Sequence, residues 1–206
     1  MIIRIFLVVL SGFSSCVQGA ILFFDPPDVG FYSLGGDIIS REIDLDLDGK
    51  NDVKLLSNIG SFKILALRDN TTVATFVTGG NDRGGNAIPY IAGDNIGSIL
   101  PNPATWFTAN DDTGASTLNA CRDIGCLGFW QGGINYAGIR IEDEEGNFRY
   151  GWLEIDAQIS GLTGGVLTRY AMETKPSVAI KAGSIPEPSS LILGTLGLLA
   201  TLHRRR

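Results

Sequence analysis

Residues 135–159, NYAGIRIEDEEGNFRYGWLEIDAQI, decide the expected fold, because two strand-like segments flank a short polar turn. The segments 135–142 and 148–159 contain Ile, Tyr, Trp and Phe, whose side chains fit a pleated, half-buried surface. Residues 144–147 lie between them and include Gly146, which is typical of a hairpin loop. The stretch therefore predicts two antiparallel neighbours in a β-sheet.

Further strand-like segments, separated by turn residues, recur on both sides of this hairpin. They are residues 20–24, 38–47, 53–56, 61–67, 71–77, 128–130 and 166–174. The intervening region 79–117 is rich in Gly, Asn, Asp and Pro, so we expect long loops there, with short strands near Ile96 and at 105–107. Many short strands with this spacing predict an all-β fold, an antiparallel β-sandwich of jelly-roll or Ig-like type with long loops.

The first 20 residues have the layout of a secretory signal peptide. Arg4 precedes an apolar run at 5–10, and small and polar residues then lead to Ala20. We therefore expect an N-terminal signal helix, recognised by the Sec translocation machinery and absent from the folded domain. Two alternatives are a lipobox at Cys16, whose preceding residues fit that pattern poorly, and a buried N-terminal strand.

Residues 185–206 form a second targeting segment with three parts in a fixed order. The parts are the triplet Pro186, Glu187 and Pro188, an uncharged stretch at 189–202, and a basic end made of Arg204, Arg205 and Arg206 after His203. This order resembles the PEP-CTERM sorting signal of exopolysaccharide-producing Gram-negative bacteria. The resemblance implies that an exosortase, a membrane-embedded transpeptidase-like enzyme, recognises and processes the tail, and that the chain is its substrate.

The physical properties of the tail agree with that resemblance. As a helix, the uncharged stretch would span about 21 Å at ~1.5 Å per residue, which is short against a hydrocarbon core about 30 Å thick. We therefore expect a short C-terminal transmembrane helix in an inner-membrane intermediate, before release to the cell surface or extracellular matrix. The positive-inside rule keeps the arginines cytoplasmic and the main domain outside. The alternative is an ordinary core helix.

Residues 21–184 remain as one β-rich extracytoplasmic domain. The 206-residue chain has a net charge of −6, and removing the arginines of the two ends makes the exported part more acidic still. Such a surface argues against nucleic acid or anionic lipid as a partner, because both are bound by basic faces. It is compatible with a divalent cation or with a neutral exopolysaccharide.

The later half of the domain also resembles a β-domain often found ahead of PEP-CTERM tails. The matching stretches are 136–140 (YAGIR), 150–153 (YGWL), 170–174 (YAMET) and 180–183 (IKAG). The resemblance covers roughly residues 38–183 and implies no known activity. Similar domains commonly carry His before the YGW motif, where this chain has Arg149.

The sharpest chemical motif is the stretch 44–52, DLDLDGKND, which follows the first nine positions of an EF-hand-like calcium loop. Carboxylates at positions 1, 3 and 5 can converge on Ca²⁺, position 7 offers a carbonyl, and position 9 adds a carboxylate. The predicted metal ligands are accordingly Asp44, Asp46, Asp48, Lys50 and Asp52.

The loop departs from the full EF-hand pattern in two ways. Leu55 stands where the bidentate Glu is expected, and the flanks are strand-like instead of helical. Alternation in the preceding segment predicts Ile43, Leu45 and Leu47 on one face and the aspartates on the other. The alternative to a calcium site is a solvated acidic hairpin.

Cys121 and Cys126 remain after signal cleavage, and both fall in a polar stretch expected to be a loop. Export to an oxidising compartment favours a small-loop disulfide between them. A redox or zinc site is the alternative, but the exported part supplies neither a histidine nor a third cysteine to complete a ligand set.

The single histidine, His203, lies in the tail, so the exported domain cannot form a Ser-His-Asp or Cys-His arrangement. The first hypothesis is therefore a non-enzymatic, calcium-stabilised protein of the surface or exopolysaccharide matrix. The alternative is a secreted carbohydrate-active hydrolase that uses Asp and Glu carboxylates, although no acidic pair stands out. Trp106, Trp130 and Trp152 are expected to pack in the core in preference to stacking on sugars.

Overall fold

The computed structural model describes residues 20–32, 37–58, 60–76, 85–108, 116–122, 125–127, 129–130, 132–158 and 164–186. Residues 1–19 of the predicted signal helix and the predicted membrane segment 189–202 lie outside these ranges, as do the remaining residues of the sorting tail from Glu187 onward. Within the ranges given, every named element is a β-strand, and no helix is long and apolar enough to cross a membrane.

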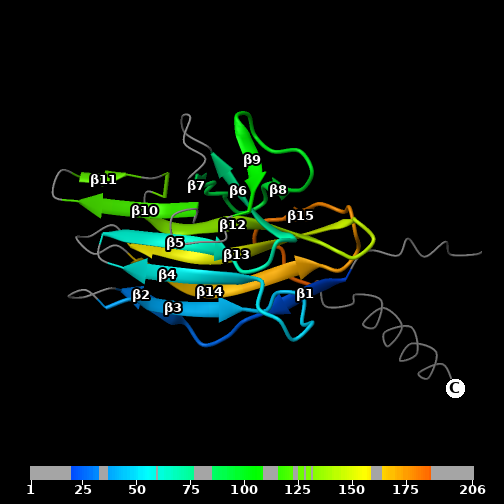
Figure 1. Ribbon diagram of the computed structural model, residues 1–206, viewed down its shortest axis with the longest axis horizontal. Helices are drawn as coiled ribbons and strands as arrows, with labels where there is room; N and C mark the ends of the chain where they lie inside the picture. The colour runs from blue at the N-terminus through cyan, green and yellow to red at the C-terminus, as the bar shows by residue number, and fades with distance from the viewer. Residues whose placement is uncertain are drawn as a thin grey trace, which may run out of the picture.

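Thirteen strands form one sheet, and two short strands form another (Figure 1). The hydrogen-bonded path of the large sheet runs through β1 (Ile21–Phe24), β14 (Gly164–Glu173), β13 (Phe148–Gln158), β12 (Gly133–Glu142), β6 (Thr71–Phe76), β7 (Asn86–Ala87), β10 (Ser116–Arg122), β5 (Ser61–Ala66), β4 (Val53–Asn58) and β3 (Ile39–Ile43). Three strands lie off this path: β2 (Val29–Tyr32) pairs with β14, β9 (Ala104–Phe107) with β6, and β11 (Gly125–Leu127) with β10. The small sheet consists of β8 (Asn95–Ile96) and β15 (Ile180–Lys181).

The large sheet folds back on itself, so that β3, β4, β5 and β10 lie over β12, β13 and β14 (Figure 1). The main apolar core fills the space between these layers, with buried members from both, among them Leu55, Ile64, Ile139, Leu153 and Ile155. The prediction of an all-β domain is confirmed. The jelly-roll or Ig-like type is not, because one continuous sheet joins the layers through β6, β7 and β10, and the β7–β10 pairing is parallel.

A second apolar cluster covers the opposite face of β12–β14. Trp152 and Tyr150 on β13 belong to it, whereas their neighbour Leu153 points into the main core, as alternation along a strand requires. Residues 88–106 and the small sheet supply the covering side chains, which include Tyr90, Ile96 and Ile180. The long central strands are therefore buried on both faces, and Trp130 and Trp152 are core residues at 2% and 0% exposure.

The predicted hairpin at 144–147 is confirmed, because Glu142 pairs with Phe148 across it and Gly146 takes a φ of 82°. The predicted strand 38–47 is too long, since β3 ends at Ile43. Leu47 has a φ of 62° and is 58% exposed, so it does not share the buried face of Ile43 and Leu45. The chain leaves the strand there because the acidic loop has begun.

Other strand predictions differ from the structure in the middle of the chain. The predicted strand 128–130 is wrong at Phe129 and Trp130, which lie outside the named strands; Gly128 is outside the described ranges. The pattern also missed β2, β7, β10 and β11, which belong to the large sheet, and β15 near the C-terminal tail.

Candidate functional site

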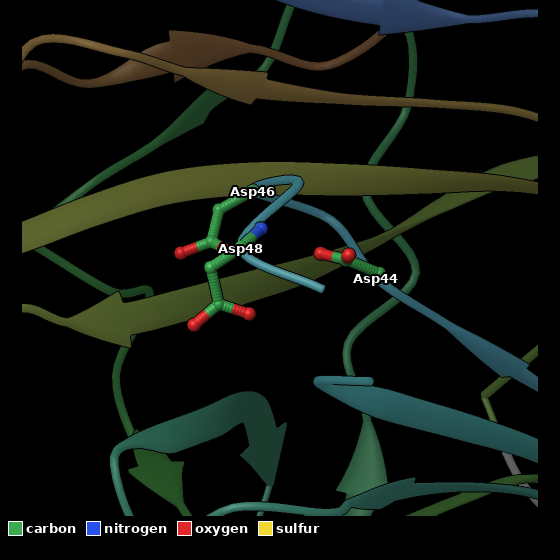
Figure 2. Close-up of side chains that lie close together, drawn as sticks. All are labelled: Asp44, Asp46 and Asp48. Atoms are coloured by element: carbon green, nitrogen blue, oxygen red, sulfur yellow. The ribbon is translucent and has the colours of Figure 1, made fainter. Parts of the chain in front are cut away.

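The connection between β3 and β4 brings three aspartates together (Figure 2). One carboxylate oxygen from each of Asp44, Asp46 and Asp48 lies within 4.8 Å of the others. The chain turns tightly enough for this because Leu47 and Gly49 take left-handed φ values of 62° and 85°. Figure 2 shows the three side chains gathered around this turn.

Backbone N–H groups of the loop donate to these carboxylates. Asp44 accepts from the N–H of Leu47 at 2.7 Å and from that of Gly49 at 2.9 Å. Asp46 accepts from Asp48 at 3.2 Å, and Asp48 accepts from Lys50 at 2.9 Å. Donors aimed at the ionised form offset part of the repulsion between neighbouring acids.

Two arginines from distant parts of the chain reach the same carboxylates. Arg149, at the start of β13, places Nη2 2.7 Å from Oδ2 of Asp46. Arg68, in the β5–β6 turn, places Nη1 2.8 Å from Oδ2 of Asp48. Burial alone would raise the pKa of Asp48, but bonds from the Lys50 N–H and from Arg68 lower it on balance. The loop therefore carries two internal counter-charges.

Asp52 lies apart from this cluster and is fully buried. Its Oδ2 accepts the Leu45 N–H at 2.8 Å, and its Oδ1 lies 3.3 Å from Nη1 of Arg68. Burial raises the pKa of Asp52 to about 6; the Leu45 N–H and Arg68 oppose the rise, while the charges of Asp46 and Asp44 add to it. The Asp52 N–H donates to the Ile43 carbonyl at 2.8 Å, so Asp52 ties the base of the loop to β3.

Of the predicted ligand residues, the structure gathers Asp44, Asp46 and Asp48, while Asp52 turns inward. The exposed Lys50 contributes its backbone N–H to Asp48. Carboxylate oxygens are the hard ligands that Ca²⁺ takes, and each oxygen has more than one lone pair. A cation at this site would share the oxygens of Asp46 and Asp48 with arginines, so the geometry fits weak binding better than tight binding.

A second charged cluster, missed by sequence reasoning, lies beneath the C-terminal segment. Glu154 on β13 is 2% exposed and accepts Nε of Arg169 at 2.9 Å and Nη2 at 2.6 Å. Hydroxyls of Tyr136 and Thr168 donate to it at 2.7 and 2.5 Å. Burial, together with the bond to Glu154 and its charge, raises the pKa of Tyr136 to about 12. All four donors bind the same carboxylate. A buried structural ion pair needs such additional hydrogen bonds to offset the cost of removing its charges from water.

The predicted disulfide cysteines lie on paired strands instead of in a loop. Cys121 on β10 is the direct antiparallel partner of Cys126 on β11. Opposed residues in such a ladder have Cα atoms about 4.5–5.5 Å apart, inside the range of roughly 4.4–6.8 Å that disulfides span. The backbone register is therefore compatible with the predicted bridge.

We expect Cys121 and Cys126 to be joined in protein taken from the exported fraction of its host. Alkylation without reduction, followed by peptide mass spectrometry, should recover both residues in one cross-linked species. Because a short loop removes little unfolded-state entropy, Cys121→Ser with Cys126→Ser should lower stability by less than the ~3 kcal/mol typical of a 15-residue loop. Recovery of both alkylated thiols from unreduced protein would contradict the bridge.

The sorting segment begins where the folded domain ends. Ala182 exchanges backbone hydrogen bonds with Asp94 and Gly93, at 2.8 and 2.9 Å. Gly183 has a φ of 73°, and a Cβ there would lie 2.7 Å from the Tyr136 hydroxyl. Pro186 is exposed and is the last described residue; Glu187, Pro188, Arg204, Arg205 and Arg206 lie outside the described ranges.

Comparison with protein-family models identifies this tail. Residues 184–206 match the PEP-CTERM protein-sorting motif. Comparison with curated proteins and with solved structures gives no significant match. The chain therefore carries a PEP-CTERM sorting motif, which marks it as an exported substrate of an exosortase that passes through a membrane-associated intermediate.

Proposed function

We propose that this exosortase substrate is a non-enzymatic structural or binding protein of the cell surface or exopolysaccharide matrix of a Gram-negative bacterium. The sorting motif at 184–206 is the observation that carries the proposal. The arrangement of the charged groups supports it, because the gathered carboxylates of the acidic loop already accept arginine and backbone donors. The buried Glu154 likewise already accepts Arg169 and the hydroxyls of Tyr136 and Thr168.

Arg204→Ser, Arg205→Ser and Arg206→Ser together should misplace the protein, because the basic cluster holds the tail end in the cytoplasm under the positive-inside rule. Fractionation of the host should find the wild type in the surface or matrix fraction, without its tail, and the triple variant elsewhere or unprocessed. Changing Arg204–Arg206 to lysine keeps the charge and provides the matched control. Normal sorting of the serine variant would contradict this part of the proposal.

We propose further that the acidic loop binds Ca²⁺ outside the cell through Asp44, Asp46 and Asp48. The distances among their carboxylates support this, since one oxygen of each lies within 4.8 Å of the others. A bound cation would attract all three carboxylates, so the net electrostatic energy of the cluster would become favourable and the β3–β4 turn would be stabilised. Extracellular modules of this kind bind at roughly 10⁻⁴–10⁻³ M.

Millimolar calcium should raise the melting temperature of the exported protein, and chelation should lower it. With a Kd of roughly 10⁻⁴–10⁻³ M the gain would be roughly 1 kcal/mol at low millimolar calcium, and it would reach about 2.7 kcal/mol only at about 100 times Kd. Magnesium should do less, because it demands octahedral geometry and gives up water reluctantly. Differential scanning calorimetry at several calcium concentrations measures the effect.

Asp46→Asn with Asp48→Asn should abolish this calcium response. The double variant also weakens both ion pairs, so Arg149→Gln serves as the control, because it breaks the Asp46 ion pair and leaves the carboxylate in place. Arg149→Gln should retain the response. If calcium changes the melting temperature of neither the wild type nor Arg149→Gln, the loop does not bind calcium. It is then an acidic hairpin neutralised by its own arginines.

A further inference from the structure

A small cavity opens in the segment that covers the outer face of β12–β14. Its volume is about 320 Å³, and its lining residues are Ile88, Pro89, Tyr90, Asp94, Asn95 and Pro101. Its lining residue Asn95 lies on β8 and pairs with Lys181 on β15, so the cavity lies next to the small sheet. This volume is near the lower end of the ~300–1,000 Å³ range of ligand pockets, which suits a single ring better than a large ligand.

The cavity wall is held in place by the core on two sides. Tyr90 exchanges both backbone hydrogen bonds with Tyr136 on β12, at 3.0 and 2.9 Å. The Asp94 carbonyl accepts the Ala182 N–H at 2.8 Å, and the Asp94 carboxylate accepts the Ile91 N–H at 2.9 Å. A wall fixed in this way needs little ordering when a ligand enters, which favours binding by a small molecule.

The lining combines apolar surfaces with groups that bind hydroxyls. Ile88, Pro89 and Pro101 are apolar, while Asp94 offers carboxylate oxygens and Asn95 an amide that both donates and accepts. The Tyr90 hydroxyl is buried without a partner among the described residues. The Tyr90 phenol, whose usual pKa is about 10, is protonated at neutral pH and can donate, and burial, followed by the Asp94 charge, raises that pKa further to about 12.

The charge of the lining narrows the class of ligand. Asp94 is acidic, and none of the other five lining residues carries a charge, so the lining itself offers an anionic ligand repulsion and no opposite charge. An apolar ligand would cover the second carboxylate oxygen of Asp94 and the Asn95 amide without hydrogen-bonding them. A neutral ring with hydroxyls around its edge and C–H groups on its faces meets both requirements.

We propose that this cavity binds one neutral pyranose ring of a polysaccharide, with its hydroxyls on Asp94 and Asn95 and its C–H face against the prolines. This proposal names a class of ligand for the proposed matrix protein. It rests on the proposed function only in taking the matrix polysaccharide as the source of the sugar. A neutral sugar residue at the end of, or within, a polysaccharide chain presents the chemistry that the wall recognises.

Saturation-transfer NMR on the full-length protein in detergent tests the proposal, with methyl glucoside, mannoside and galactoside as neutral probes and glucuronate as the anionic one. At least one neutral pyranoside should bind with a millimolar Kd, and glucuronate should bind about tenfold more weakly. Asp94→Asn and Asn95→Ala should each weaken binding about tenfold. The Asp94→Asn side chain keeps an oxygen that can accept the Ile91 N–H. Asp28→Asn, at an exposed acid outside the cavity lining, should bind as the wild type does.

Three results would overturn the proposal: no neutral pyranoside binds, glucuronate binds as tightly as the neutral probes, or the Asp94 and Asn95 variants bind like the wild type. Melting temperatures near that of the wild type would show that both variants remain folded. Fractionation of the host reports on the proposed function separately. A protein that reaches the matrix but binds no pyranoside refutes the cavity proposal alone, and one that binds sugar but is not exported refutes only the matrix role.

Discussion

Arg169→Met should destabilise the domain by roughly 3–5 kcal/mol, because it leaves Glu154 as a buried carboxylate without its cation. Glu154 is 2% exposed, and two of its four side-chain donors are guanidinium nitrogens of Arg169. The hydroxyls of Tyr136 and Thr168 would remain as donors, which places the expected loss toward the lower end of that range. Urea denaturation at pH 7 measures it.

The pH dependence of the loss gives the sharper test. Burial would raise the pKa of Glu154, but bonds from Arg169, Thr168 and Tyr136 lower it on balance. In the wild type this carboxylate therefore stabilises the fold above its unfolded pKa of about 4.3, and the stabilisation disappears as pH falls through the folded pKa. Without the guanidinium, burial should raise the folded pKa, so the variant loses stability as pH rises through the unfolded value.

The difference in unfolding free energy between the wild type and Arg169→Met should accordingly become smaller as pH falls from 7 to 4. Glu154→Gln combined with Arg169→Met removes the buried charge and should recover part of the loss at pH 7. Arg41→Met, at an arginine on the edge strand β3, is the matched control and should cost within about 0.5 kcal/mol. A difference independent of pH would mean that Arg169 acts through packing alone.

The sequence predicted the parts of the fold that depend on neighbouring residues. The hairpin of β12 and β13 follows from two apolar segments around Gly146, and the gathering of Asp44, Asp46 and Asp48 follows from their spacing around Gly49. In both cases the deciding interactions lie within a few residues of one another, so the local pattern contains the information.

The missed features all depend on contacts between distant residues. Arg149 reaches Asp46 across 103 residues, and no local pattern marks it as the loop's counter-charge. The pairing of Asn86 with Thr117 joins the two layers into one sheet through β7, which has two residues and is too short to show alternation. Residues 88–106 look like loops in the sequence because their buried side chains are isolated, although together with β15 they help to cover the outer face of β12–β14.

Trp152→Ala should cost roughly 3–5 kcal/mol, the usual loss for a large aromatic side chain deleted from a core. Trp152 is 0% exposed and packs edge-on against Tyr136, with ring centroids 5.3 Å apart. Its indole N–H has no hydrogen-bond partner among the described residues, so Trp152→Phe should lose much less by removing this orphan donor. Thermal and urea unfolding of the three proteins measures the series.

The region of the fold that is destabilised should differ between a Trp152 variant and a variant of its neighbour on β13. Leu153→Ala deletes a side chain of equal burial from the main core and should cost about 2–5 kcal/mol without affecting the outer face selectively. Trp152 supports the layer that holds the C-terminal segment, so Trp152→Ala should also speed hydrogen exchange at the Tyr90 and Ala182 amides, which bond to Tyr136 and Asp94. In that variant the segment before the sorting motif would be held less firmly to the domain than in the wild type. Equal acceleration of those two amides in Leu153→Ala would show that the faces unfold together, and that the outer layer does not anchor the tail independently.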